Sequence, residues 1–359
     1  MERIQPPPRD SWFAPLSVDV LLRVLNVTIF HPFVAWIIPL CFRAEHHAFD
    51  TMPMRVTMAW ATFITLLAFA NLISHKIAYG MHREVDLNEE VIVITGGASG
   101  LGMLIAEVYG MRGATVAILD TADMDSTDAR GITYYRCDVS DKTQLARVAA
   151  EIERDLGTPT ILINNAAVVV GKSLLEMEPE DFERSISTNL TAHFHTIKRF
   201  LPGMIQNETG GTIVTLSSVL GQLGAAQLAD YAAAKAGVTA LHKSLAAELR
   251  QQGYPEIKTI LVTPGQLSTP LFAGVKTPNS FLAPVVEPIE VAKEIIKAID
   301  LGLSDHIAMP LYARWVDWYN VLPVGVQKVA RRMAGVDRSM ATFVGRRGTE
   351  LREKNGSLI

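Results

Sequence analysis

A tyrosine and a lysine lie four residues apart in the segment that runs from Tyr231 to Lys235. Residues 230–250 are rich in alanine and leucine and predict a helix, so both side chains project from one helix face. A free tyrosine has a pKa of about 10 and is a poor base near neutral pH. A neighbouring ammonium group stabilises the phenolate, so this pair has the chemistry to move a proton.

A serine at the end of an apolar run adds a hydroxyl. Residues 212–218 predict a strand that ends in Ser218, thirteen residues before Tyr231. Ser218 can hydrogen-bond a substrate oxygen while Tyr231 exchanges the proton. A tyrosine and a lysine at this spacing are common on solvated helices, but their position after a strand-end serine and a glycine-rich turn favours the catalytic interpretation.

The glycine-rich turn opens at Thr95 and contains Gly96, Gly100 and Gly102. It follows the apolar residues 91–94, which predict a strand buried on both faces, and it precedes a segment with helical spacing. Glycines let the backbone approach a pyrophosphate, and the helix start offers unpaired amides and a positive dipole end. Such a turn can also simply tighten a strand-helix corner. The strand-turn-helix context favours a dinucleotide site.

Asp120 lies at the end of the next apolar run, residues 114–119, eighteen residues beyond Gly102. A carboxylate there accepts both hydroxyls of the adenosine ribose and repels a 2′-phosphate. No Arg or Lys follows in the next few positions, so NAD is favoured over NADP. The alternative is a cap for the next helix.

Residues 134–139 and 161–163 predict a third and a fourth strand. Asp138 is placed where a side chain meets the adenine. Asn164 and Asn165 follow the fourth strand and can tie neighbouring strand ends together and line the cofactor cleft. A simple asparagine turn explains them equally well.

In their order along the chain, these motifs resemble the short-chain dehydrogenase/reductase family over roughly residues 88–310. The resemblance implies an α/β fold with a doubly wound parallel sheet of Rossmann type and an oxidoreductase that uses a nicotinamide dinucleotide. Ala167 departs from the family pattern, which has glycine there. The catalytic residues that the resemblance implies are Asn189, which holds a water in a proton relay, Ser218, Tyr231 and Lys235. The cofactor-binding residues that it implies are Thr95, Gly96, Ser99, Gly100, Leu101, Gly102, Asp120, Asp138, Val139, Asn165, Ala166, Tyr231, Lys235, Pro264, Gly265 and Thr269.

Residues 1–87 have a different character and predict a membrane-anchoring region. Residues 56–74 carry no charge, and as a helix they would extend about 28 Å, close to the hydrocarbon thickness of about 30 Å. Residues 24–42 are also uncharged, but Pro32 and Pro39 disfavour a straight helix, so this segment is a kinked span or half of a hairpin. A buried core helix is the alternative. Basic residues on the outer flanks predict that the catalytic domain, residues 88–310, faces the cytosol.

Residues 311–359 form a C-terminal extension with apolar and basic residues interleaved. Such a segment lies at a bilayer interface, completes the substrate pocket or forms a dimer contact. The net charge of −4 argues against a nucleic-acid surface. Cys41 and Cys137 have no evident partner, which indicates a reducing compartment, and no metal-ligand spacing occurs.

Together these features predict a membrane-bound, NAD-dependent dehydrogenase that oxidises a lipophilic alcohol to the carbonyl, with a homodimer as a further possibility. The extension and the N-terminal region resemble the retinol and hydroxysteroid dehydrogenase branch, which implies a retinoid, sterol or long-chain lipid substrate. The implied location is the endoplasmic reticulum, with the lipid droplet as an alternative. An NADPH-dependent carbonyl reductase and a catalytically silent lipid-surface scaffold are the competing functions.

Overall fold

The computed structural model describes residues 16–80, 82–122, 131–277 and 279–345. It divides into two compact units, residues 1–80 with 280–282 and residues 81–279 with 283–359. The second unit contains the glycine turn, Tyr231 and Lys235, and we call it the catalytic unit.

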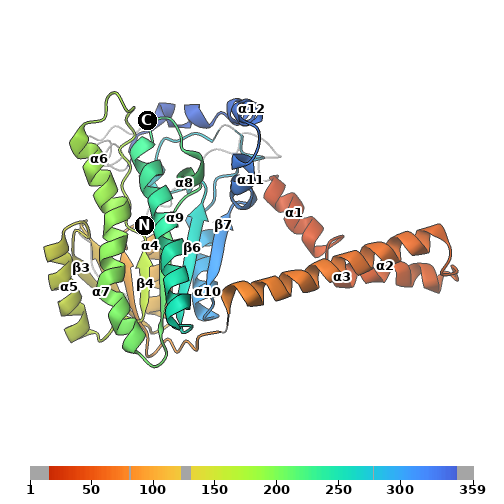
Figure 1. Cartoon of the computed structure of the whole chain (residues 1–359), viewed down its shortest axis with the longest axis horizontal. Coiled ribbons are helices and arrows are strands. Elements are labelled where there is room, and N and C mark those ends of the chain that lie inside the picture. Colours follow the sequence, from red (N-terminus) through yellow and green to blue (C-terminus); the bar gives the residue numbers. More distant parts are fainter. Residues whose placement is uncertain (1–15, 81, 123–130, 278, 346–359) are drawn as a thin grey trace. The chain divides into compact units, whose positions relative to one another are not determined.

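A seven-stranded parallel sheet forms the centre of the catalytic unit, in the order β3-β2-β1-β4-β5-β6-β7 (Figure 1). The strands are β1 (Val91–Thr95), β2 (Thr115–Asp120), β3 (Ile132–Arg136), β4 (Ile161–Asn164), β5 (Gly211–Leu216), β6 (Ile257–Pro264) and β7 (Asp305–Met309). Every residue of β1, β4, β5 and β6 is buried, as expected for strands covered by helices on both faces. The predicted doubly wound parallel sheet is confirmed.

Helices cover both faces of this sheet. The helices α4 (Gly100–Met111) and α10 (Pro288–Asp300) pack on one face, and α5 (Lys142–Asp155), α7 (Ala192–Gln206) and α9 (Ala229–Gln252) pack on the other. The shorter elements are α6 (Pro179–Ile186), the π-helical turn η1 (Ser187–Thr191), α8 (Leu220–Leu223), α11 (Val316–Asn320) and α12 (Val324–Ala334), with 3-10 turns at η2 (Pro270–Phe272), η3 (Leu311–Arg314) and η4 (Val336–Thr342).

The chain order reverses at β1, which pairs with β2 on one side and with β4 on the other. In open α/β sheets, ligands bind outside the carboxyl ends of the strands at such a switch point. The glycine turn after β1 and the asparagines of β4 therefore meet at the expected ligand crevice.

The first unit contains the helices α1 (Val18–Val27), α2 (Pro32–Ala44) and α3 (Met52–Tyr79). The predicted 56–74 span lies inside α3, whose 28 residues extend about 42 Å. The predicted 24–42 segment is interrupted, because α1 ends at Val27 and α2 begins at Pro32 with a bend of 54°. Within the described residues, one helix is long and apolar enough to cross a membrane, or two if the bent pair counts as one span.

The helices α2 and α3 pack side by side as a hairpin within this unit (Figure 1). Trp36 Nε1 donates to Thr65 Oγ1 at 3.0 Å, and Trp60 Nε1 donates to the Ile29 carbonyl at 3.2 Å. These bonds satisfy the indole N–H groups, and most other large apolar side chains of the hairpin point outward.

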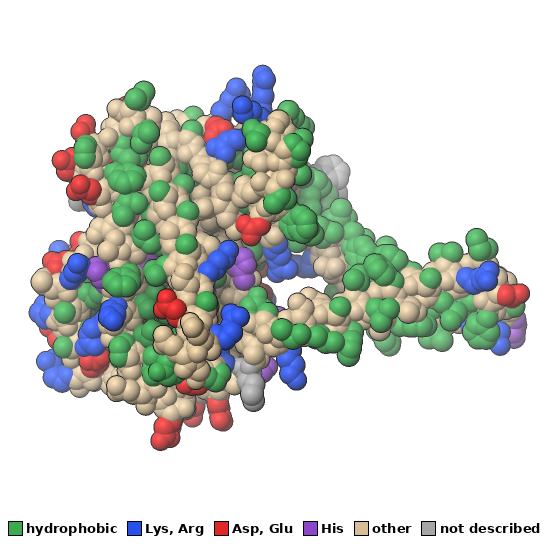
Figure 2. Space-filling model, viewed as in Figure 1, with side chains coloured by type: hydrophobic (Ala, Val, Ile, Leu, Met, Phe, Trp, Pro, Cys, Tyr) green, Lys and Arg blue, Asp and Glu red, His purple; other side chains and the backbone are tan. Residues whose placement is uncertain are grey.

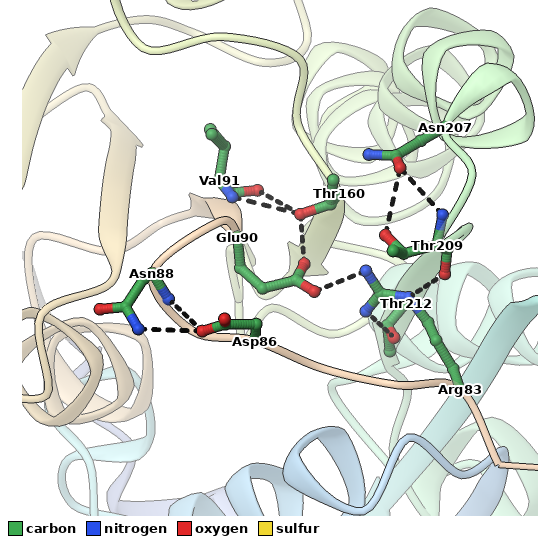
Figure 3. Close-up of polar contacts among 9 residues, drawn as sticks. All are labelled: Arg83, Asp86, Asn88, Glu90, Val91, Thr160, Asn207, Thr209 and Thr212. Atoms are coloured by element: carbon green, nitrogen blue, oxygen red, sulfur yellow. Dashed lines mark hydrogen bonds and ion pairs between the residues drawn. The ribbon is translucent and has the colours of Figure 1, made fainter.

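Arg83 docks the segment after α3 onto the amino ends of the strands (Figure 3). Its guanidinium donates to Glu90 Oε1 at 2.6 Å and to the Thr209 carbonyl at 2.7 Å, and Thr160 Oγ1 donates to the other oxygen of Glu90. Both charged side chains are buried, with 1% and 4% of their surface exposed. Residues 82–87 belong to the catalytic unit, and this buried ion pair holds Arg83 against the strands.

Candidate active site

The glycine turn closes against the residues that follow β4. Gly96 has φ of +65°, and a Cβ there would lie 2.7 Å from Ala166 Cα. A Cβ at Gly102 would lie 2.6 Å from the Gly96 carbonyl oxygen. Both positions therefore require glycine, and the backbone between them is open to a ligand.

Two side chains tie the ends of β1 and β4 together. Thr95 Oγ1 accepts hydrogen bonds from the amides of Asn165 and Ala166, at 3.0 and 3.1 Å. Asn165 Nδ2 donates to the carbonyls of Thr95 and Gly96, at 3.1 and 2.8 Å. Thr95 is thus buried behind the crevice, while Asn165 faces it.

Asp120 stands at the carboxyl end of β2 with both oxygens held by the backbone. Its Oδ2 accepts from the Ala98 amide and its Oδ1 from the Ala122 amide, each at 3.0 Å. Asp138, after β3, is held through one oxygen, because its Oδ1 accepts from the amide and the hydroxyl of Ser140 at 2.9 and 2.7 Å. Two fixed carboxylates therefore line the end of the crevice where the adenosine is expected.

The crevice is a cleft of about 740 Å³ over the carboxyl ends of the strands. Fifteen of the predicted site residues line it: Gly96, Ser99, Gly100, Leu101, Asp120, Asp138, Val139, Asn165, Ala166, Ser218, Tyr231, Lys235, Pro264, Gly265 and Thr269. Thr95, Gly102 and Asn189 are not part of its lining, and they support it from behind. The glycine cradle and the carboxylates fit a nicotinamide dinucleotide.

The Tyr231 ring lies at the cleft against Phe272, with ring centroids 5.8 Å apart and planes at 88°. Burial raises the pKa of Tyr231 above its ordinary value, hydrogen bonding with Ser218 lowers it, and the charge of Asp230 raises it. The protein groups alone therefore keep this phenol neutral near pH 7.

Lys235 lies one helical turn after Tyr231, with Nζ 5.6 Å from the tyrosine ring centroid. Nζ donates to the Leu216 carbonyl at 2.7 Å, and burial lowers the pKa of Lys235 to about 7. The expected effect of Lys235 on the Tyr231 pKa is not among the effects that set that pKa in this structure. A lysine with a pKa of about 7 can nevertheless gain and lose a proton near neutral pH.

Ser218 and Asn189 have different surroundings. Ser218 Oγ accepts from the Leu220 amide at 3.2 Å and lies 3.5 Å from the Pro264 carbonyl, which leaves the hydroxyl at the cleft. Asn189 is buried, with Oδ1 accepting from the Val168 amide and Nδ2 donating to the Val168 carbonyl, both at 2.9 Å. Nδ2 also donates to Ser185 Oγ at 3.0 Å, so the Asn189 amide group is committed to protein partners.

The apolar end of the cleft includes Phe343 and Val344 of the C-terminal extension, for which a role in the substrate pocket is one of the alternatives that the sequence offers. Its lining includes Val168, Val169, Leu267, Leu271, Phe272, Phe343 and Val344. Phe343 packs on Gly171, which has φ of +73°, and a Cβ there would collide with the phenyl ring. The two residues are far apart in the chain, so no local signal could have paired them.

Comparison with known proteins identifies a family and several relatives that this chain resembles. Residues 90–279 match the family described as short chain dehydrogenase. An uncharacterized oxidoreductase of Saccharomyces cerevisiae is 33% identical over 260 residues, which cover 70% of this chain and 83% of that protein. Short-chain dehydrogenase/reductase family 16C member 6 of Bos taurus is 31% identical, with coverage of 77% and 88%. Retinol dehydrogenase 10 of Homo sapiens is 32% identical, with coverage of 74% and 88%.

Proposed function

Because this chain belongs to the short-chain dehydrogenase/reductase family and is an oxidoreductase of the nicotinamide dinucleotide class, we propose that it is a membrane-anchored, NAD-dependent dehydrogenase that oxidises a lipophilic alcohol to the carbonyl. The observation that carries the proposal is the position of Tyr231 between a dinucleotide cradle and an apolar wall.

The catalytic roles follow from the positions of three side chains. Ser218 Oγ orients the substrate oxygen at the cleft, and the Tyr231 phenolate takes the hydroxyl proton. Lys235 binds the ribose and exchanges protons behind the tyrosine. When bound, the oxidised dinucleotide supplies the hydride acceptor and a positive charge beside Tyr231, which favours the phenolate that burial disfavours.

Asp120 supports NAD as the cofactor. Backbone amides hold its carboxylate at the cleft, where it can accept the two ribose hydroxyls and where a 2′-phosphate would meet a negative charge.

The wall beside Tyr231 supports a lipophilic substrate. Tyr231, Leu228 and Met340 form one buried cluster, and the apolar side chains of Val169, Phe272 and Phe343 are among those that pack on it. Such a surface suits a long hydrocarbon or a ring system. The relatives named retinol dehydrogenase are consistent with a substrate of the retinoid, sterol or long-chain alcohol class.

The hairpin of α2 and α3 supports an integral anchor, since hydrophobic side chains cover its surface (Figure 2). A second apolar surface, which we call the α11–α12 surface, belongs to the catalytic unit. It presents exposed Trp315, Trp318, Val321, Leu322, Val324, Val326, Val329 and Met333. Exposed Lys328 and Arg332 lie on the same helices, and this mixture of aromatic, aliphatic and basic residues suits an anionic bilayer surface.

Arg331 fixes the α11–α12 surface to the end of α8. It forms a two-fold ion pair with Asp337, at 2.7 and 2.6 Å, and donates to the carbonyls of Leu223 and Gly224 at 3.0 Å each. The loop it holds connects Ser218 to Tyr231. We propose that the mouth of the substrate site lies beside the membrane, which we expect to be that of the endoplasmic reticulum, with the catalytic unit on the cytosolic side.

The test is a turnover screen with the full chain in detergent, using NAD and NADP over retinoids, sterols and long-chain alcohols. Oxidation with NAD supports the proposal. Reduction of a lipid ketone with NADPH would establish the carbonyl reductase instead. If the protein binds a dinucleotide but turns over no combination of cofactor and lipid, the catalytically silent lipid-surface scaffold is favoured.

A further inference from the structure

Residues 339–345 of the C-terminal extension lie along the loop that follows β6, and we call them the strap. The hydrogen bonds that fasten the strap run from the Lys276 amide to the Ser339 carbonyl at 3.2 Å, from Thr342 Oγ1 to the Gly274 carbonyl at 2.6 Å, and from the Val344 and Gly345 amides to the Ala273 carbonyl at 2.9 and 3.1 Å. All but the Thr342 bond use only backbone atoms. They therefore fix the path of the strap independently of its side chains.

The Phe343 ring of the strap reaches the loop that follows β4. It packs on Gly171, where a Cβ would collide with the ring. It also packs on the buried cluster formed by Leu228, Tyr231 and Met340. The Phe343 amide donates to the Met340 carbonyl at 3.0 Å, which closes a tight turn before the ring. The ring is thus held from both sides, by its own strap and by the loop of Gly171.

The strap crosses the end of the strand that leads to Ser218. The strands β4, β5 and β6 are neighbours in the sheet, and all three are parallel. Gly171 follows β4, Ser218 follows β5 and Ala273 follows β6. A segment that contacts the loops after β4 and β6 therefore passes over the end of β5. Phe343 and Val344 line the same cleft as Ser218, so the strap covers the part of the cleft where the substrate is expected.

Phe343 limits the room for the hydrocarbon part of a substrate. In the proposed function, Ser218 and Tyr231 hold the reacting oxygen, so the hydrocarbon extends from them along the apolar lining. Phe272 meets the Tyr231 ring edge-on, with centroids 5.8 Å apart, and flanks this path. Phe343 closes the path where the strap reaches Gly171. Because backbone bonds fix the strap and Gly171 seats the ring, a longer hydrocarbon meets a rigid stop.

The strap lies outside the part of the chain that matches the family. That match ends at residue 279, and it includes Ser218, Tyr231 and Lys235. Phe343 belongs to the C-terminal extension. A residue outside the shared core is suited to select the substrate, while the shared core carries the reaction.

We propose that Phe343 is a specificity-determining residue that sets the longest hydrocarbon that the cleft accepts. This inference rests on the proposed function and narrows its substrates to lipophilic alcohols whose hydrocarbon part ends against this ring. Affinity for straight-chain alcohols should then rise about fourfold for each methylene that the cleft buries. It should stop rising at the alcohol whose chain reaches Phe343.

Binding of primary alcohols from hexanol to hexadecanol tests this length limit. The full chain in detergent is titrated by calorimetry without a dinucleotide, so that no turnover occurs. Partition of an alcohol into micelles is the same for every variant and cancels in the ratio of variant to parent Kd. Phe343→Leu and Phe343→Ala enlarge the cleft in two steps, and Phe343→Leu keeps most of the apolar contact that holds the strap.

We expect the limit to move to longer alcohols in Phe343→Leu and farther in Phe343→Ala. Alcohols beyond the parent limit should bind about fourfold tighter for each additional buried methylene, while the affinity for hexanol stays near the parent value. The matched control is Phe194→Ala, because Phe194 is a half-exposed phenylalanine of α7 that is not among the residues that line the cleft. It should keep the parent limit.

An unchanged limit in both Phe343 variants overturns the proposal. A change in affinity that is equal at every chain length also overturns it, because that result indicates a general loss of structure. A shifted limit in Phe194→Ala does the same. Turnover of the same alcohols with NAD tests the proposed function separately. A limit that moves as expected, without oxidation of any alcohol, supports the role of Phe343 and contradicts only the proposed function.

Discussion

Tyr231 carries its phenol among apolar side chains, so removal of the hydroxyl alone is a clean test of its role. We expect Tyr231→Phe to lower kcat by about 10²- to 10⁴-fold, because proton transfer by a positioned side chain contributes about that much. The ring contact with Phe272 persists, so NAD affinity and thermal stability stay near the parent values. Steady-state kinetics and a fluorescence titration with NAD provide the measurements.

The matched control is Tyr135→Phe. Tyr135 is a buried tyrosine whose hydroxyl has no partner among the described residues, and it is not among the residues that line the cleft. It should leave kcat unchanged. Activity of Tyr231→Phe within a few-fold of the parent would refute the assigned proton carrier.

Asp120 allows a test of cofactor choice that preserves one of its two backbone contacts. Asp120→Asn keeps an oxygen that can accept from the Ala98 amide but removes the negative charge. We expect the ratio of kcat/KM for NADP to that for NAD to rise about tenfold, equivalent to about 1.4 kcal/mol of relieved repulsion. Addition of Thr121→Arg should raise it further by supplying a phosphate partner.

Asp138→Asn is the comparison for Asp120→Asn, because Asp138 is a second fixed carboxylate in the same cleft, at the expected adenine position. It should leave the cofactor ratio unchanged. If the ratio did not respond to Asp120→Asn, another group would select the cofactor.

At the level of elements, the Arg83 ion pair fastens the segment after α3 to the amino ends of the strands (Figure 3). Arg83→Met leaves Glu90 buried without its cation, and loss of one partner of a buried pair costs about 3–5 kcal/mol. We therefore expect a marked loss of unfolding free energy, measured by chemical denaturation in detergent. Arg83→Met with Glu90→Gln should recover much of it.

An exposed ion pair serves as the comparison, because it measures how much a surface contact contributes to the unfolding free energy. Arg147 and Glu151 pair on α5 with 61% and 30% of their side-chain surface exposed. Arg147→Met should cost no more than about 1 kcal/mol. Equal losses for Arg83→Met and Arg147→Met would contradict a stabilising role for the buried pair.

At the level of the whole molecule, the proposed membrane attachment depends on residues before the catalytic unit. The full chain should resist carbonate extraction from microsomes, because α3 is long and apolar enough to span the bilayer. A chain that begins at His82 retains Arg83 and should be released by carbonate with its fold intact. A chain that begins at Val85 loses Arg83 and should be less stable than the His82 chain.

Protease treatment of sealed microsomes tests the orientation. Cleavage of the catalytic unit without detergent is expected for a cytosolic location, and protection of the unit would exclude that location. Full-length protein in the carbonate supernatant would exclude the anchor.

The sequence by itself determined the parallel sheet and the oxidoreductase class. Continuous apolar runs, a glycine turn, a strand-end serine and a Tyr-Lys pair are local patterns, and local patterns specify strands, turns and the residues at their ends. Their order along the chain was enough to predict a parallel doubly wound sheet, because parallel strands bring their carboxyl ends to one edge.

Only the tertiary structure decided what depends on contacts between distant residues. Arg83 meets Glu90 and Thr209, Phe343 packs on Gly171, and Arg331 holds the loop after α8. No periodicity or motif encodes these contacts, since each arises where the packed chain brings together side chains that are far apart in sequence, and burial then sets their hydrogen bonding and charge.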